Sequence, residues 1–199
     1  MKISRGPEVV RFRLSGPIIE RLVEQAVNKP DRRRFVATLG LLPFASPAVW
    51  AGGARTVRLD HLHTGEKLEI EYFAGGNYIA EALASVNHFL RDFRTGDVGR
   101  IDAGLLDLLA SLAATTGSRR PFEVISGYRS LVTNEALRQR SGGVASGILH
   151  TRGQAIDIRL ADVPLGTLRD AARALRAGGV GFYPASNFVH VDTGRVRYW

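Results

Sequence analysis

Three side chains that could bind a metal ion lie near the carboxyl end of this sequence. His150 and Asp157 stand seven residues apart in "HTRGQAID", and His190 follows in "NFVHVDTG". Two imidazoles and one carboxylate are a sufficient ligand set for a catalytic zinc ion, which keeps its fourth position for water. A zinc ion in such a site activates that water for hydrolysis. The first hypothesis from these residues is therefore a metal-dependent hydrolase.

Each of the three residues also has an ordinary structural explanation. A histidine on a strand is more often a hydrogen-bonded core residue than a ligand, and Asp157 could pair with the nearby Arg159. Three separate buried polar groups would each need their own partners, however, and a shared metal satisfies all three together. His61 and His63 are a weaker candidate pair, because they lie in an exposed-looking hairpin with no third ligand nearby.

Several other hydrolytic mechanisms are excluded by residue types. The chain has no cysteine, which removes thiol nucleophiles, cysteine-ligated zinc and disulfides. The only lysines are Lys2, Lys29 and Lys67, and none follows a serine by three positions, so the Ser-x-x-Lys motif of penicillin-type serine enzymes is missing. The His-Glu-x-x-His motif of zincin proteases is also absent.

Hydrophobic periodicity predicts the elements that would position these side chains. Residues 56–73 alternate as in a hairpin, whereas 77–93 and 102–117 have helical spacing, with Asn77 and Asp102 as caps and Gly117 as the end of the second helix. Ile156 and Ile158 would face away from Asp157 by strand alternation. Further strands are expected at 122–126, 154–160, 180–183, 188–193 and 195–199, and further helices at 132–140 and 165–178. The pattern predicts an α+β fold with a central antiparallel sheet flanked by helices.

The first 51 residues differ in character from the rest. They hold 9 of the 27 Lys and Arg residues of the chain but only 4 of its 19 Asp and Glu residues. The rest of the chain is therefore only mildly basic, and we do not expect it to bind nucleic acid. The first 51 residues also contain the pattern of a twin-arginine-type export signal. This pattern begins with Arg32 and Arg33, continues with an apolar stretch, and ends with Val49 and Ala51 before a possible cleavage site. We therefore expect an N-terminal extension over 1–31, a signal over 32–51 and a catalytic domain over 52–199.

Three tracts carry a resemblance to a known family. "SGYRS" at 126–130, "HTRGQAID" at 150–157 and "HVD" at 190–192 together resemble the zinc D-Ala-D-Ala peptidases, and most closely their exported murein endopeptidase branch. The resemblance covers about the last 140 residues. It implies the hedgehog/DD-peptidase fold, with Zn²⁺ held on the sheet by His150, Asp157 and His190. It also implies that Arg129 lies beside the metal and contacts substrate oxygens, for which a planar guanidinium is well suited.

The sequence departs from that family at two positions. Many relatives carry a serine where Ile148 stands, so the nearest hydroxyl is Ser146; several carry an acidic general base where Asn187 stands. Asp192 is the nearest carboxylate to His190 and is expected to be either the base or a partner that orients that histidine. Ser126, Tyr128, Ser146 and Asn187 are the expected substrate contacts.

The resemblance implies a zinc-dependent peptidase that hydrolyses amide bonds of murein stem peptides, most simply an endopeptidase that cuts cross-links. The alternatives are a DD-carboxypeptidase and a non-catalytic, zinc-containing murein-binding module. Export by the twin-arginine machinery would place the protein in the periplasm, with no stable membrane span once the leader is removed.

Overall fold

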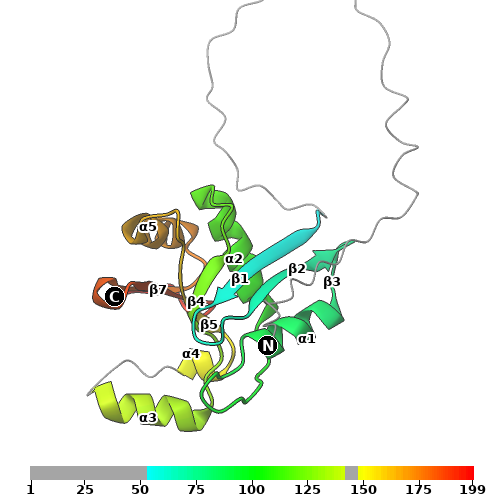
Figure 1. Cartoon of the computed structure of the whole chain (residues 1–199). Helices are drawn as coiled ribbons and strands as arrows, with labels where there is room; N and C mark the ends of the chain where they lie inside the picture. Colours follow the sequence, from blue (N-terminus) through cyan, green and yellow to red (C-terminus); the bar gives the residue numbers. More distant parts are fainter. Residues whose placement is uncertain (1–52, 142–147) are drawn as a thin grey trace, which may run out of the picture. The chain divides into compact units, whose positions relative to one another are not determined.

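The computed structural model describes residues 53–141 and 148–199 (Figure 1). The predicted leader and N-terminal extension, and Ser146, lie outside these residues. Within them, the helices and strands follow one another in this order: β1 (Arg55–His61), β2 (Lys67–Ala74), β3 (Asn77–Tyr78), α1 (Ala80–Phe89), α2 (Ala103–Thr116), β4 (Phe122–Ser126), α3 (Leu131–Ser141), α4 (Ile148–Thr151), β5 (Ala155–Arg159), α5 (Leu165–Leu175), β6 (Gly179–Tyr183), a 3₁₀ turn (Pro184–Ser186), β7 (Phe188–Asp192) and β8 (Arg197–Tyr198).

The strands form one sheet in the order β3-β2-β1-β4-β5-β7-β6-β8. The α+β class is confirmed, but the sheet is mixed, which corrects the expectation of an antiparallel one. β1 runs parallel to β4, and β6 runs parallel to β8, whereas the other neighbouring pairs are antiparallel. A parallel pair cannot be closed by a tight hairpin and needs a longer connection. Here β2, β3, α1 and α2 connect β1 to β4, and β7 connects β6 to β8.

The two sides of the central strands have different roles. Ile156 and Ile158 of β5, and Val189 and Val191 of β7, are buried in the hydrophobic core. Helix α5 packs against β6, β7 and α2, and α2 also packs against β1. Figure 1 shows α2 and α5 together, away from α3 and α4. Because alternate residues of a strand face opposite sides, the core positions of β5 and β7 force Asp157 and His190 onto the other side.

Several predicted helix ends are moved by the structure, including the end of α1, which lies at Phe89 and not at Phe93. Asn77 belongs to β3, where it pairs with Ala74, and α1 begins only after Ile79. The amide of Asn77 bonds the carbonyl of Gly75 in the β2–β3 turn instead of capping a helix. The last predicted helix ends at Leu175, before Gly178, and its C-cap residue Arg176 has a left-handed conformation. By contrast, α2 begins after Asp102, whose carboxylate accepts from the Gly104 amide, and ends at Gly117 as predicted.

No helix within residues 53–141 and 148–199 is both long enough and apolar enough to cross a membrane.

Candidate metal centre and substrate cleft

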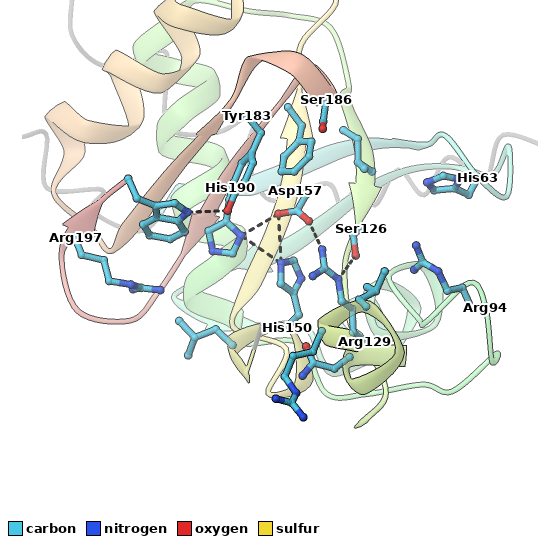
Figure 2. Close-up of a pocket in the computed structure, with 17 residues that line it drawn as sticks. His63, Arg94, Ser126, Arg129, His150, Asp157, Tyr183, Ser186, His190 and Arg197 are labelled. Carbon is cyan, nitrogen blue, oxygen red and sulfur yellow. Dashed lines mark hydrogen bonds and ion pairs between the residues drawn. The ribbon is translucent and has the colours of Figure 1, made fainter. Parts of the chain in front are cut away.

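His150, Asp157 and His190 meet on the side of the sheet away from α2 and α5 (Figure 2). Asp157 and His190 are direct partners in the β5–β7 ladder, and His150 reaches them from α4. One ligand atom from each residue lies within 4.8 Å of the other two, and all three side chains are buried. Among the described residues this is the single group of histidine and acidic side chains with the geometry for a metal ion.

Hydrogen bonds on the far side of each imidazole fix its orientation. Nδ1 of His150 donates to the carbonyl of Gly127 at 2.7 Å, because a carbonyl can only accept. Nε2 of His190 lies 3.0 Å from Oδ2 of Asp192. The remaining nitrogens, His150 Nε2 and His190 Nδ1, are 3.2 Å apart and face Asp157. Outer partners of this kind set the tautomer and direction of metal-binding histidines.

The charges of the group suit a cation at its centre. Burial lowers the pKa of His150, so its imidazole is neutral. Burial on its own raises the pKa of Asp157, but His150, His190 and Arg129 lower it far below its ordinary value, so this carboxylate is ionised. Burial on its own lowers the pKa of His190, but hydrogen bonds with Asp157 and Asp192 raise it above its ordinary value. A cation bound at the centre would displace the proton from Nδ1 of His190, because a ligand histidine must be neutral. Two imidazoles and one carboxylate would then present their lone pairs to the same buried ion.

The tight connection between α4 and β5 places His150. The carbonyl of Gly153 accepts from the amide of Asp102, and the carbonyl of His150 accepts from the amide of Arg129. Gly153 has a φ of 66°, and a β-carbon there would lie 2.0 Å from the carbonyl oxygen of Arg100. Only glycine permits this approach, so the glycine in the "HTRGQAID" tract is explained by the docking of α4 beside the sheet.

Arg129 forms a hydrogen-bonded ion pair with the aspartate of this centre. Its Nε donates to Oγ of Ser126 at 2.8 Å, and its terminal nitrogen donates to Oδ2 of Asp157. Ser126 and Asp157 are themselves paired across β4 and β5. The two contacts use one edge of the guanidinium. Arg129 also lines the cleft described next, so its remaining donors are available to a bound molecule.

A cleft of about 380 Å³ opens over the centre. The aromatic side chains of Tyr183, Phe188 and Trp199 line one part, and His63 and Arg94 line another. Figure 2 shows His63 and Arg94 on the opposite side of the ligand group from Tyr183. Arg129, Arg138 and Arg197 also contribute, whereas Asp157 is the only acidic side chain among the described residues that line the cleft. The cleft therefore favours a ligand that carries negative charge.

Comparison with known proteins identifies the family. Residues 49–199 match the family model described as peptidoglycan L,D-endopeptidase MepK. The chain belongs to this family. It is 51% identical over 145 residues to the peptidoglycan L,D-endopeptidase MepK of Escherichia coli K12 and equally to that of Shigella flexneri, covering 73% of this chain and 80% of each relative. It is 41% identical over 146 residues to the probable MepK of Haemophilus influenzae, covering 73% and 78%. The resemblance stated from the three tracts is thereby confirmed.

The other predicted site residues differ in whether they reach the cleft. Ser126 lines the cleft beside Arg129. Tyr128 does not line it: its ring packs over Gly99, where a β-carbon would lie 2.2 Å from the ring. Asn187 is exposed, has a φ of 54° at the end of the 3₁₀ turn, and donates its backbone amide to Pro184. Asparagine tolerates this left-handed conformation better than most residues, so its type is explained by the turn.

Asp192 is fully buried and lies outside the cleft lining. Its oxygens accept from His190, from Arg197 and from the backbone amides of Gly179 and Gly194. Although burial raises the pKa of this carboxyl, these donors hold it well below its ordinary value. This geometry favours the second of the two roles that the sequence left open, a partner that orients His190.

Several cleft residues were missed by the sequence analysis, among them Arg94, Tyr183, Phe188 and Trp199. Tyr183 and Phe188 could have been found from strand alternation, since they lie two positions from Gly181 and His190, which pair across β6 and β7. Arg94 and Trp199 carried no such signal, because the irregular segment after α1 and the end of β8 reach the cleft only through tertiary packing.

The pair His61 and His63 is not a second metal centre. His61 is buried, contrary to the exposed hairpin expected, with its ring against Phe89 and Phe93. Its Nδ1 accepts from the backbone amides of His63 and Thr64 at 3.2 and 3.4 Å. His63 instead stacks on Phe93, with ring centroids 4.0 Å apart, and lines the cleft.

The buried His61 makes folding sensitive to acid. Burial lowers its pKa from 6.5 to about 4, so between these values the unfolded chain binds more protons and stability falls as the pH is lowered. From pH 7 to pH 5 this group is expected to lower the free energy of unfolding by about 2 kcal/mol. Urea unfolding at both values, on wild type and on His61→Asn, measures the difference. Equal pH dependence in the two proteins would contradict this assignment.

Proposed function

We propose that this protein is a zinc-dependent peptidoglycan endopeptidase that hydrolyses L,D-amide bonds in murein stem peptides. The observation that supports this most directly is the buried His150, Asp157 and His190 group beside Arg129 at the floor of a basic cleft. Membership of the MepK family supplies the substrate class, because the relatives are named as peptidoglycan L,D-endopeptidases. The same membership supports the hedgehog/DD-peptidase fold as the architecture.

Zinc fits the three ligands by their chemistry. Two neutral imidazole nitrogens and one carboxylate oxygen are a common protein ligand set of catalytic zinc, and they leave the fourth position open. The bound ion would supply Lewis acidity and lower the pKa of a water molecule. Asp157 Oδ1 faces the two histidines, whereas Oδ2 holds Arg129. Asp157 thus connects the metal centre to the residue that meets the substrate.

Arg129 would act on the oxygen of the scissile carbonyl. Its Nε and one terminal nitrogen are held by Ser126 and Asp157, so the guanidinium has one preset orientation. Donors fixed in advance stabilise the negative charge that develops on the carbonyl oxygen, since they need not reorient during the reaction. The surrounding Arg94, Arg138 and Arg197 would attract the carboxylates of stem peptides.

We assign Asp192 to the orientation of His190, and this makes a prediction for Asp192→Asn. An amide keeps the shape but loses the charge-assisted bond to Nε2 of His190. Zinc affinity is expected to fall 10- to 100-fold, as for other outer partners of metal-binding histidines. Competition with a chromogenic chelator measures it, with Asp170→Asn as the matched control, because Asp170 is exposed and its hydrogen bonds within the described residues go to Arg169, far from His190 in the sequence. Unchanged zinc affinity in Asp192→Asn would count against the assignment.

Ser146 and Asn187 remain predicted substrate contacts, the first in the segment outside the described residues. Export through the twin-arginine machinery, with removal of residues 32–51 and action in the periplasm, follows from the leader pattern and from a substrate that lies outside the cytoplasmic membrane. N-terminal sequencing of the protein from a periplasmic extract tests it: a start at Gly52 is expected.

A non-catalytic murein-binding module is the second candidate. The observation in its favour is that no carboxylate other than Asp157 lines the cleft within the described residues, so no acidic general base stands beside the metal site. The intact ligand set and Arg129 favour the enzyme.

Digestion of purified, cross-linked murein separates these functions. The protein is incubated with murein in the presence of zinc, or of a chelator, and the products are identified by mass spectrometry. Chelator-sensitive loss of dimers joined by L,D bonds is the expected result. Dimers that lose only a terminal D-alanine would indicate a carboxypeptidase. Intact substrate, with zinc shown to be bound and murein shown to be retained in a pull-down, would indicate the binding module.

A further inference from the structure

Tyr183 lies beside the metal centre although no sequence motif pointed to it. Gly181 pairs with His190, and Tyr183 pairs with Phe188, across β6 and β7. Residues two apart on a strand share a face, so Tyr183 is on the same side of the sheet as His190. Figure 2 shows its hydroxyl next to the His190 ring, on a different side of the ligand group from Arg129.

The indole of Trp199 holds this tyrosine in place. Trp199 continues the β6–β8 pairing, with its amide bonded to Val180 and its carbonyl to Phe182. Its ring lies over Gly181, where a β-carbon would come within 2.7–2.8 Å of the indole atoms. The glycine therefore provides the space for the indole, whose centroid is 5.3 Å from that of the His190 ring.

The hydrogen bond between the two residues has only one possible direction. An indole N–H can only donate, so Nε1 of Trp199 donates to the Tyr183 hydroxyl oxygen at 2.7 Å. The tyrosine ring is also stacked on Phe188, with centroids 4.6 Å apart. Among residues 53–141 and 148–199 the hydroxyl has no other hydrogen-bond partner. Its own hydrogen is therefore free to be donated into the cleft that Tyr183 lines.

We propose that Tyr183 is a catalytic residue whose hydroxyl donates a hydrogen bond to an oxygen of the tetrahedral carbon during hydrolysis. Attack of water on an amide carbon gives a centre with two oxygens. Arg129 and Tyr183 lie on different sides of the ligand group and would each serve one of them. Trp199 is a positioning residue that acts through Tyr183: its N–H occupies an acceptor lone pair and leaves the hydroxyl to donate. The inference rests on the proposed peptidase function.

Tyr183→Phe removes the hydroxyl and keeps the ring on Phe188. With a purified muropeptide dimer joined by an L,D bond, kcat is expected to fall about 10²-fold with KM little changed, because the donor acts on charge present only in the transition state. Zinc content is expected to stay at the wild-type level. Tyr198→Phe is the matched control, since its hydroxyl bonds the Arg173 carbonyl and does not line the cleft; its kinetics are expected to equal those of wild type.

Trp199→Phe tests the positioning role. It removes the N–H donor but keeps an aromatic ring, so a smaller fall in kcat is expected. The double variant with Tyr183→Phe should then be no slower than Tyr183→Phe alone, because without the hydroxyl the indole has nothing to orient. A purely structural role of Trp199 would instead lower kcat in both backgrounds by the same factor.

A second readout does not depend on turnover. A phosphinate analogue of the scissile unit carries two oxygens in the arrangement of the tetrahedral carbon, and calorimetry gives its affinity for the zinc-loaded protein. Tyr183→Phe is expected to weaken it at least tenfold, while Tyr198→Phe leaves it unchanged. Equal phosphinate affinity in wild type and Tyr183→Phe would overturn the inference, as would unchanged kcat or loss of zinc from Tyr183→Phe. If wild type itself cleaved no murein, the proposed function would fail and the catalytic role of Tyr183 with it, whereas the phosphinate titration would still show whether its hydroxyl contacts a bound tetrahedral group.

Discussion

Replacing Asp157 by asparagine is expected to remove bound zinc and to lower murein hydrolysis by about 10³-fold or more. The substitution keeps the size of the side chain but removes the charge that faces His150 and His190 and that holds Arg129. A metal ion contributes several kcal/mol of transition-state stabilisation, and each 1.36 kcal/mol is a factor of ten in rate. Zinc content by atomic absorption and the rate of dimer cleavage measure the two effects together.

The matched control is Glu123→Gln. Glu123 and Arg159 form a pair across the same two strands, β4 and β5, but outside the cleft. The control makes the same carboxylate-to-amide change and is expected to keep both zinc and activity. Full zinc occupancy in Asp157→Asn, with the fold intact by circular dichroism, would rule out Asp157 as a ligand.

Arg129→Lys is expected to lower kcat by about 10²- to 10³-fold while zinc stays bound. Lysine keeps the positive charge near Asp157. It lacks the planar guanidinium, however, which can contact Ser126 and Asp157 with one edge and point its other donors into the cleft. The substitution therefore weakens stabilisation of the negative charge on the carbonyl oxygen, and removal of one fixed donor of this kind lowers kcat by about 10²- to 10³-fold. Steady-state kinetics on the muropeptide dimer, with zinc content measured on the same samples, separates the two contributions.

Arg159→Lys is the corresponding control for Arg129. It changes arginine to lysine in the ion pair with Glu123, on strand β5 but away from the cleft, and is expected to leave kcat unchanged. Because a module that only binds murein has no kcat to lose, this experiment also discriminates between the two proposed functions. A rate for Arg129→Lys within threefold of wild type would mean that the guanidinium only pairs with Asp157.

The group of three side chains that could bind a metal was predictable from sequence because buried polar residues stand out in an apolar strand. A carboxylate between isoleucines and a histidine between valines cannot be buried without partners, and the alternation of β5 and β7 predicts which side they face. The α2 helix was predictable for a similar local reason: Asp102 and Gly117 supply its two ends. Family membership was recognisable from three short tracts, each of which the structure places at or beside the candidate metal centre.

Other features depended on which strands become neighbours. The mixed sheet, the burial of His61 between Phe89 and Phe93, and the packing of Tyr128 over Gly99 follow from contacts between segments far apart in the chain. No local pattern contains that information, because strand order is decided by how all the strands and helices of the domain pack together.

The sequence by itself thus determined which three side chains could bind a metal, the strand faces of Asp157 and His190, and the family, since these depend on residue chemistry and on a period of two. Only the tertiary structure decided which other side chains surround this group. The β6–β7 register brings Tyr183 beside His190, and the β6–β8 pairing places the Trp199 indole against its hydroxyl. Burial encloses Asp192 behind His190. Register, pairing and enclosure are properties of assembled strands, so they arise only when the sheet is formed.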